Sequence, residues 1–108
     1  NTHYTTSSGW PTPEALRTQR TTAFDQATLL RYVHGQSDAV QDFFRKSSVT
    51  FRGGTYPNTN KLLRDSYYRA AITASKTGFT CSAGRNVIMN VNLPNGEFGI
   101  GTFGHSSF

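Results

Sequence analysis

The sequence is poor in the residues that build disulfides, metal sites and membrane spans. Its 108 residues include one cysteine, Cys81, which excludes both an internal disulfide and a cysteine-rich zinc site. The three histidines lack metal-ligand spacing, and no apolar run approaches the length of a transmembrane helix. No signal peptide is visible and the first residue is not methionine, so we expect a processed or excised piece of a longer protein.

Acidic residues are also scarce. Six aspartates and glutamates face eleven lysines and arginines, which leaves a net charge of +5. This surplus favours a polyanionic partner, which could be a nucleic acid, a nucleotide or an acidic protein. The length predicts one domain with a modest core, to which the 13% of aromatic residues contribute much of the buried area.

The order of periodic segments predicts an α+β fold. Residues 1–12 are rich in Thr, Ser, Gly and Pro and are typical of a flexible arm, and residues 13–108 form the single domain. In the first part of the chain, apolar residues recur at helical spacing, and Thr22 and Ser37 are suited to cap two of the helices. Later segments alternate apolar and polar residues as strands do. We expect helices over about 13–19, 23–34, 38–46 and 60–75, and strands over 48–52, 79–82, 86–93 and from 98. The fold class is therefore N-terminal helices followed by a small, mostly antiparallel sheet with one intervening helix.

The same periodicity predicts the core. Apolar residues of the third and fourth predicted helices and of the alternating strand should be largely buried: Phe43, Phe44, Leu63, Val87, Met89 and Val91.

The first candidate for chemistry is Arg52, which ends a predicted strand just before Gly53. An arginine next to backbone without side chains could bind a phosphate that approaches closely. The alternative is an arginine at a strand end that pairs with Asp42 or Asp65, and on the residues alone this structural interpretation is favoured.

The second candidate is the hydroxyl-rich segment around Thr80 and Ser82. Its hydroxyls and the Cys81 thiol could orient a ribose or a reacting group, although an ordinary edge strand ended by a turn explains the same residues. The third candidate is the pair His34 and His105, which could supply the base and the acid of metal-free RNA cleavage. No spacing rule joins these two histidines, and His34 also suits the negative end of a helix.

These elements together resemble the arginine–serine–glutamate class of ADP-ribosyltransferase toxins. Phe51-Arg52-Gly53 matches the aromatic-Arg-Gly strand of that family, and Thr80-Cys81-Ser82 stands where the family has Ser-Thr-Ser. Arg52 and Ser82 are 30 positions apart (82 − 52), a spacing that suits the family. The Glu-x-Glu element of the family does not occur in the sequence.

The resemblance implies an ADP-ribosyltransferase-like fold and NAD as the substrate, with no metal. Arg52 and Gly53 would receive the dinucleotide, and Thr80 and Ser82 would line its ribose region. The catalytic glutamate would come from elsewhere, for example from a second chain that completes the fold. The family also implies a toxin or effector secreted or delivered by a bacterium, which acts on an unidentified macromolecular acceptor in the cytosol of a target cell.

Two further functions stay open on the residues. One is a small metal-free ribonuclease toxin that uses His34 and His105, since a basic surface suits RNA. The other is a non-catalytic basic domain that docks an acidic immunity or carrier protein.

Overall fold

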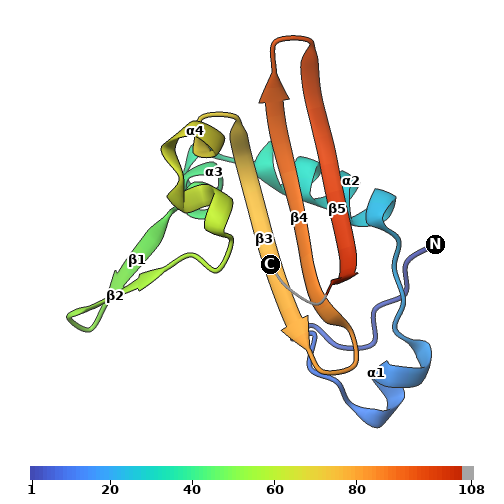
Figure 1. The fold of residues 1–108 in the computed structure, drawn as a ribbon. Helices are drawn as coiled ribbons and strands as arrows, with labels where there is room; N and C mark the ends of the chain where they lie inside the picture. Colours follow the sequence, from blue (N-terminus) through green and yellow to red (C-terminus); the bar gives the residue numbers. More distant parts are fainter. Residues whose placement is uncertain (106–108) are drawn as a thin grey trace.

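Helices open the chain and a three-stranded sheet closes it (Figure 1). The computed structural model describes residues 1–105. The elements are α1 (Pro13–Thr18), α2 (Ala23–His34), α3 (Asp38–Arg45), β1 (Ser48–Phe51), β2 (Gly54–Pro57), η1 (Lys61–Arg64), α4 (Ser66–Arg69), β3 (Ile72–Thr80), β4 (Gly84–Leu93) and β5 (Gly96–His105). The predicted α+β class, with helices first and small antiparallel sheets after them, is confirmed.

Side-chain caps fix where the first three helices begin. Thr12, Thr22 and Ser37 each accept a hydrogen bond from a backbone N–H in the first turn of α1, α2 and α3 respectively. The predicted caps of α2 and α3 are therefore confirmed. Within residues 1–105 the longest helix has twelve residues, and none combines the length and apolarity needed to cross a bilayer.

The predicted helix over 60–75 is wrong. Only single helical turns form there, η1 and α4, and from Ile72 onward the chain pairs with β4 as the strand β3. Asp65 accepts a hydrogen bond from the Tyr67 N–H and so caps the beginning of the second turn, α4. Pairing along β4 satisfies the backbone of 72–80 and outweighs the weak helical periodicity of that segment. The strand predicted for 79–82 is the end of β3 and the turn after it.

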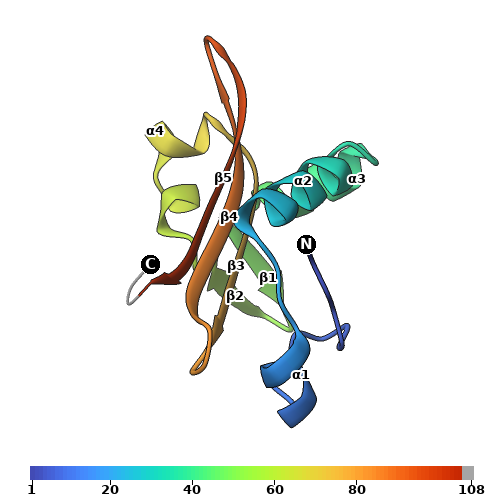
Figure 2. The same ribbon diagram turned by 90° about the vertical axis from the view of Figure 1, so that its right-hand side faces the viewer.

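The sheet has the order β3-β4-β5 and is antiparallel throughout. Figure 2 shows it nearly edge-on, with α2 and α3 on one side and α4 on the other. On the side of η1 and α4, a cluster of buried apolar residues packs against the sheet and forms the core: Leu63, Ile72, Met89 and Val91, with Val87 partly buried beside them.

The core prediction holds for Leu63, Met89 and Val91, whereas Val87 and Phe44 are half-buried. It is wrong for Phe43, whose side chain is 69% exposed. The apolar stripe of α3 runs beside the edge of β3 and does not enter the cluster around Leu63, so its periodicity indicates an apolar face without showing what covers that face.

Two glycines of β5 let α2 approach the other side of the sheet. A Cβ on Gly99 would lie 2.9 Å from Ala27 Cβ, and one on Gly101 would lie 3.1 Å from Ala23 Cβ. Ala and Gly thus form the contact between helix and strand, and under α2 the strand β4 buries Asn90, which is 1% exposed.

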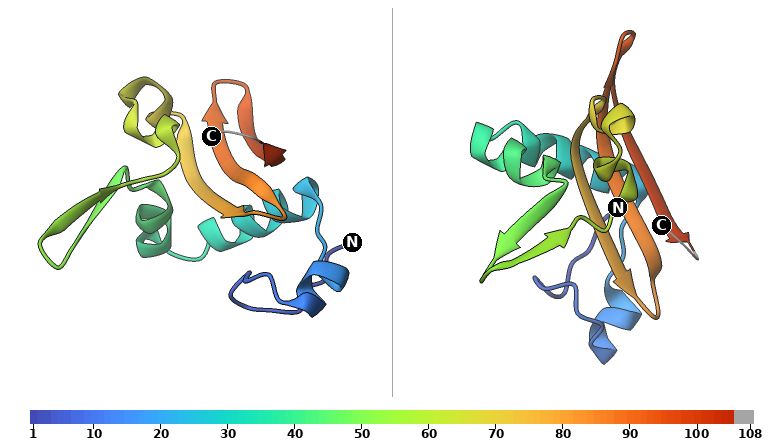
Figure 3. Two further views of the ribbon diagram at one scale, coloured as in Figure 1. Left: turned by 60° about the horizontal axis from the view of Figure 1, so that its bottom comes forward. Right: turned by 60° about the vertical axis from the view of Figure 1, so that its left-hand side comes forward.

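The strands β1 and β2 form a separate antiparallel hairpin. It projects away from the sheet (Figures 1 and 3). Its turn is made by Arg52 and Gly53, which have φ angles of 48° and 79°. Two successive positive φ values are typical of the tight turns that match the twist of a two-stranded ribbon.

Candidate functional site

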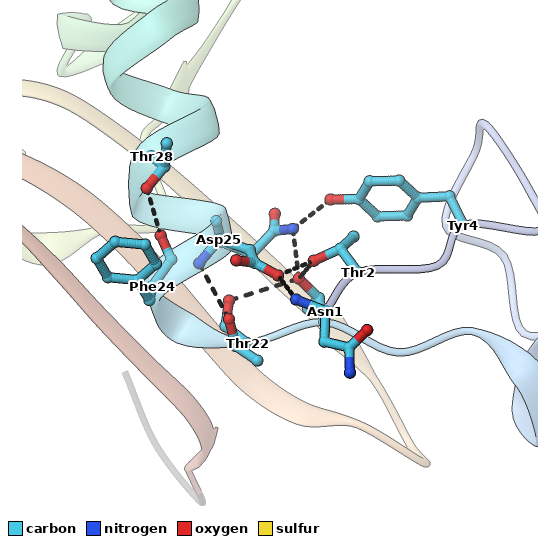
Figure 4. A network of polar contacts seen from close by, with 9 residues as sticks. Asn1, Thr2, Tyr4, Thr22, Phe24, Asp25 and Thr28 are labelled. Carbon is cyan, nitrogen blue, oxygen red and sulfur yellow. Dashed lines mark hydrogen bonds and ion pairs between the residues drawn. The ribbon is translucent and has the colours of Figure 1, made fainter.

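The N-terminal arm is held against the start of α2 (Figure 4). The Asn1 ammonium group donates to Asp25 Oδ2 at 2.5 Å, and Thr2 Oγ1 donates to the same oxygen at 2.6 Å. These hydrogen bonds, that of the ammonium group first, lower the pKa of Asp25 below its ordinary value. Next to Asp25 on α2, Gln26 Nε2 donates to the hydroxyl group of Tyr4 in the arm.

A second set of contacts fixes the next part of the arm. His3 and Arg20 form an isolated antiparallel bridge, with N···O distances of 2.8 and 3.0 Å. Gln19 Oε1 accepts from the backbone N–H groups of Thr5 and Thr6, each at 3.2 Å. Residues 1–6 are therefore placed by hydrogen bonds at several points, and the chain that follows runs past the lower half of β3.

Two hollows lie between this arm and β3. One, of about 710 Å³, is lined by arm residues from Tyr4 to Gly9 and by Lys76 of β3. The other, of about 500 Å³, is lined by Trp10, Leu16 and the β3 residues 78–80. Both are lined by Ser8, Gly9 and Gln19, so the two hollows adjoin, and we call them together the arm trough. None of the described residues that line it is acidic.

Lys76 and Gly78 of β3 line the trough, and Thr77 between them lines a third hollow. The Lys76 side chain is exposed and its ammonium group donates to the Thr77 carbonyl oxygen. Thr77 Oγ1 is 2.5 Å from Thr59 Oγ1, which orients the half-buried hydroxyl. A Cβ placed on Gly78 would meet nothing within 4 Å, so the strand presents bare backbone to the trough there.

The edge of β3 is open to pairing. The strand lies at one end of the order β3-β4-β5, and among residues 1–105 no strand pairs with its outer side. An exposed edge of this kind can bind an extended peptide through main-chain hydrogen bonds. A third hollow, of about 340 Å³, also reaches Lys76 and Thr77 and is walled by Phe43 and Tyr56.

The structure separates the residues chosen from the sequence. Arg52 and Gly53 form the turn of the projecting β1–β2 hairpin, whereas Thr80 and Ser82 line the arm trough at the far end of β3 (Figures 1 and 3). The hydroxyls of Thr80 and Ser82 are 3.3 Å apart. The hairpin turn is therefore not part of the site that these two hydroxyls line.

The remaining candidates are also placed. His34 ends α2 and is half-buried, and the side chain of His105 lies outside the described part of the structure. Cys81 is free and exposed in the β3–β4 turn. Within the described residues, no three His, Cys, Asp or Glu side chains gather closely enough to hold a metal ion.

Comparison with known proteins identifies the family. The sequence profile of the S11 peptidases, described as D-alanyl-D-alanine carboxypeptidase, matches residues 1–97. The chain belongs to this family. The S11 match covers the arm, all four helices, both strands of the hairpin, and β3 and β4. Among curated proteins no sequence matches the chain.

A solved structure agrees in fold. The chain is similar to the crystal structure of a D-alanyl-D-alanine carboxypeptidase from Mycobacterium tuberculosis H37Rv, with a TM-score of 0.73 and 21% sequence identity. The likeness covers 94% of this chain and 38% of that one, so the chain spans less than half the length of the solved relative.

The family directs attention to a tripeptide that the sequence interpretation missed. Lys76-Thr77-Gly78 reads K-T-G, one of three short motifs of penicillin-binding proteins and class A β-lactamases, whose nucleophile is the serine of S-x-x-K. The 108 residues contain neither S-x-x-K nor S-D-N. The signal was in the sequence, but a helix was predicted up to residue 75 and a strand from residue 79, which placed the tripeptide between two elements and not on an edge strand.

The ADP-ribosyltransferase resemblance is wrong, because the S11 profile and the carboxypeptidase fold account for nearly the whole chain. The toxin and NAD-transferase function fails with it, and neither the ribonuclease nor the docking-domain alternative is supported. Phe51-Arg52-Gly53 is a hairpin turn and Thr80-Cys81-Ser82 the end of a strand, elements that recur in many folds. The implied binding of NAD, the acceptor, the second chain and the target-cell location rested on that resemblance alone and are untested.

Proposed function

We propose that this chain supplies the strand that binds the peptide terminus in a serine carboxypeptidase acting on D-alanyl-D-alanine. The observation that carries the proposal is the position of Lys76-Thr77-Gly78 on an edge strand, at the meeting point of three hollows. The motif alone is short, and its place beside an open cavity is the context that gives it meaning.

The chemistry of each residue suits a peptide that ends in a free carboxylate. The exposed Lys76 ammonium group is a point charge with three donors, and no described residue lining the trough is acidic and competes for it. The Thr77 hydroxyl adds a donor when Thr59 is the donor of the hydrogen bond that joins the two hydroxyls, because either oxygen can donate in that pair. Gly78 leaves room for the main chain of the peptide to lie against β3.

The role of this chain in such a reaction is to bind and orient. A serine hydroxyl attacks the carbonyl between the two D-alanines and gives its proton to a base, the new C–O bond forms, and the C–N bond breaks as that proton passes to the leaving amine of free D-alanine. Water then hydrolyses the resulting ester. Because S-x-x-K is not among the 108 residues, the serine would lie outside them, and β3 would hold the substrate in register for its attack.

Calorimetry on this chain tests the proposal. A blocked tripeptide that ends in D-Ala-D-Ala should bind, and the same peptide with an amidated carboxyl end should bind at least about tenfold more weakly, since the charged hydrogen bond to Lys76 is lost. Lys76→Gln should remove this preference, while Lys61→Gln, a control on η1, should keep it. Equal binding of the acid and the amide by the unmodified chain would refute the proposal.

A further inference from the structure

A hollow lined by basic side chains lies away from the arm trough, at the junction of α3, β1 and α4. It has a volume of about 790 Å³ and is lined by Arg45, Lys46 and Arg69 together with Asp42. All of these charged residues are exposed. In Figure 1 the junction lies to the left of the sheet, whereas α1 lies at the lower right. We call this cavity the basic hollow.

Much of the positive charge of the chain is concentrated in this region. Residues 42–69 hold six of the eleven lysines and arginines but two of the six acids. Within residues 1–105, no carboxylate forms an ion pair with Arg45, Lys46 or Arg69. Asp42 stands one helical turn before Arg45 and offsets part of the charge, so the hollow keeps a positive surplus that is available to a ligand.

Hydrogen bonds fix the walls of the basic hollow. Arg69 Nη1 donates to Ser47 Oγ at 3.4 Å, and this bond joins α4 to the α3–β1 junction, although α3 and α4 lie on opposite sides of the sheet (Figure 2). Asn58 holds the same junction from the other direction. Its Nδ2 donates to the Lys46 carbonyl oxygen at 2.9 Å, and its backbone N–H donates to the Ser47 carbonyl oxygen at 2.7 Å. Because these contacts exist before a ligand arrives, little backbone entropy remains to be lost on binding.

The donors in the hollow suit phosphate groups. A guanidinium group presents parallel N–H groups that match two phosphate oxygens, and the Lys46 ammonium group adds a point charge. The hydroxyl groups of Ser47, Ser48 and Thr50 complete the lining. The Ser47 oxygen accepts from Arg69 and can still donate its own O–H to a phosphate oxygen.

We propose that the basic hollow binds a linear phosphodiester polymer that carries no bases, such as an alditol phosphate chain. This inference goes beyond the proposed function and does not depend on it. The hollow is much larger than a single phosphate group, and its cations come from both the end of α3 and α4. Successive phosphates of one polymer can therefore contact different cations, which release the counterions of the polymer on binding.

The lining separates this partner from two other polyanions. None of the described residues that line the hollow is aromatic, so the bases of a single-stranded nucleic acid would have no surface on which to stack. Val49 is the one apolar residue among them, whereas a surface that docks on a membrane places several large apolar side chains among the headgroups.

The position of the hollow leaves the peptide site free. The basic hollow shares Lys46, Ser48 and Val49 with the third hollow, which in turn reaches Lys76 and Thr77. It shares no lining residue with the arm trough. A polymer bound there would hold the protein beside its peptide substrate without occupying the trough.

Calorimetry at low salt with a synthetic poly(glycerol phosphate) tests the proposal. Arg69→Gln and Lys46→Gln should each weaken binding about tenfold, because each removes a charged hydrogen bond. Arg17→Gln, the same loss of charge at an exposed arginine on α1, should leave the affinity unchanged. Arg69→Gln should also lower the slope of log K against log salt by about one.

Two further variants exclude an indirect effect on folding. Asp42→Asn removes the carboxylate from the lining and should strengthen binding about threefold, a gain that damage to the fold would not produce. Arg69→Lys keeps the charge but loses the paired N–H groups, so it should give an intermediate loss.

The opposite results would overturn the proposal. Equal weakening by Arg17→Gln, or equal binding of polyglutamate, would show attraction by net charge alone. Tighter binding of oligothymidylate, or binding to phosphatidylglycerol vesicles without binding to the polymer, would assign the hollow to another partner. Arg69→Gln should still bind the tripeptide that ends in D-Ala-D-Ala, so failure of this proposal and failure of the proposed function are told apart.

Discussion

The two halves of β3 have opposite surroundings. The first half is closed in: Ile72, Ala74 and Ser75 are 3%, 0% and 5% exposed, and they face η1 on one side and α2 and α3 on the other. In the second half Lys76, Gly78 and Phe79 are exposed. One strand thus joins a rigid core to an open edge, and the core holds the edge in place without covering it.

The largest effect should come from the closed half. Leu63→Ala removes a fully buried side chain from the cluster with Ile72 and Met89, and should lower the free energy of unfolding by about 3 kcal/mol. Leu62→Ala, the neighbouring residue at 37% exposure, should cost less than about 1 kcal/mol. Denaturant unfolding measures both. If the two variants lost similar amounts of unfolding free energy, Leu63 would not be a core residue and this account of the core would be wrong.

A buried polar pair also belongs to the closed half. Asn60 Nδ2 donates to Ser75 Oγ at 2.7 Å, and Asn60 Oδ1 accepts from the Leu62 N–H at 3.1 Å. Asn60→Ala should destabilise the fold by about 2 kcal/mol, since it leaves buried groups unpaired. A double-mutant cycle with Ser75→Ala should give a coupling energy of about 1 kcal/mol. Strict additivity would show that the two side chains do not interact.

In the open half of β3, a larger side chain should weaken peptide binding and leave the stability of the fold nearly unchanged. Gly78→Val adds a β-branched residue to a strand where nothing lies within 4 Å of the new Cβ, so the stability should stay within about 0.5 kcal/mol. Peptide binding should fall about tenfold because the valine fills the floor of the trough, and Gly78→Ala should give an intermediate loss. Calorimetry beside thermal unfolding tests this. Loss of stability without loss of binding would reverse the assignment of the two halves.

The smallest effect concerns the arm at its anchor on α2. The hydrogen bond from the N-terminal ammonium group lowers the folded-state pKa of Asp25 below its ordinary value, so the contribution of this carboxylate to stability is present above the ordinary pKa and is lost as the pH falls through the folded-state pKa. Asp25→Asn should remove this part of the acid dependence of stability, which falls at acid pH where the carboxylate becomes protonated. Superimposable pH profiles for the variant and the unmodified chain would show that the arm is not held by this carboxylate.

The comparison within β3 explains what could be predicted from the sequence. The alternation in 86–93 identified β4 and two buried members of the core, Met89 and Val91, with Val87 partly buried beside them, because the apolar residues of that strand share one face. It did not show that α2 covers the other face, where Asn90 is buried. Polar alternation normally indicates a solvated face, and here the small residues Gly99 and Gly101 allow a helix to approach instead.

The site was missed for a related reason. In 60–75 leucine, tyrosine and alanine recur at helical spacing, and this local pattern hid the beginning of β3 at Ile72. The pairing with β4 that decides the matter is a contact between segments that a periodicity within one segment does not contain. Once 72–80 is a strand, Lys76-Thr77-Gly78 falls on a sheet edge beside a cavity, the context in which the tripeptide is informative.

The most direct test of the central claim is the map of amide chemical-shift changes when the chain binds a blocked tripeptide ending in D-Ala-D-Ala. We predict that the largest changes fall on residues 76–80, with a change at the Trp10 indole N–H, while the Arg52–Gly53 turn stays unchanged. Changes centred on the β1–β2 hairpin, with none along the second half of β3, would contradict the account.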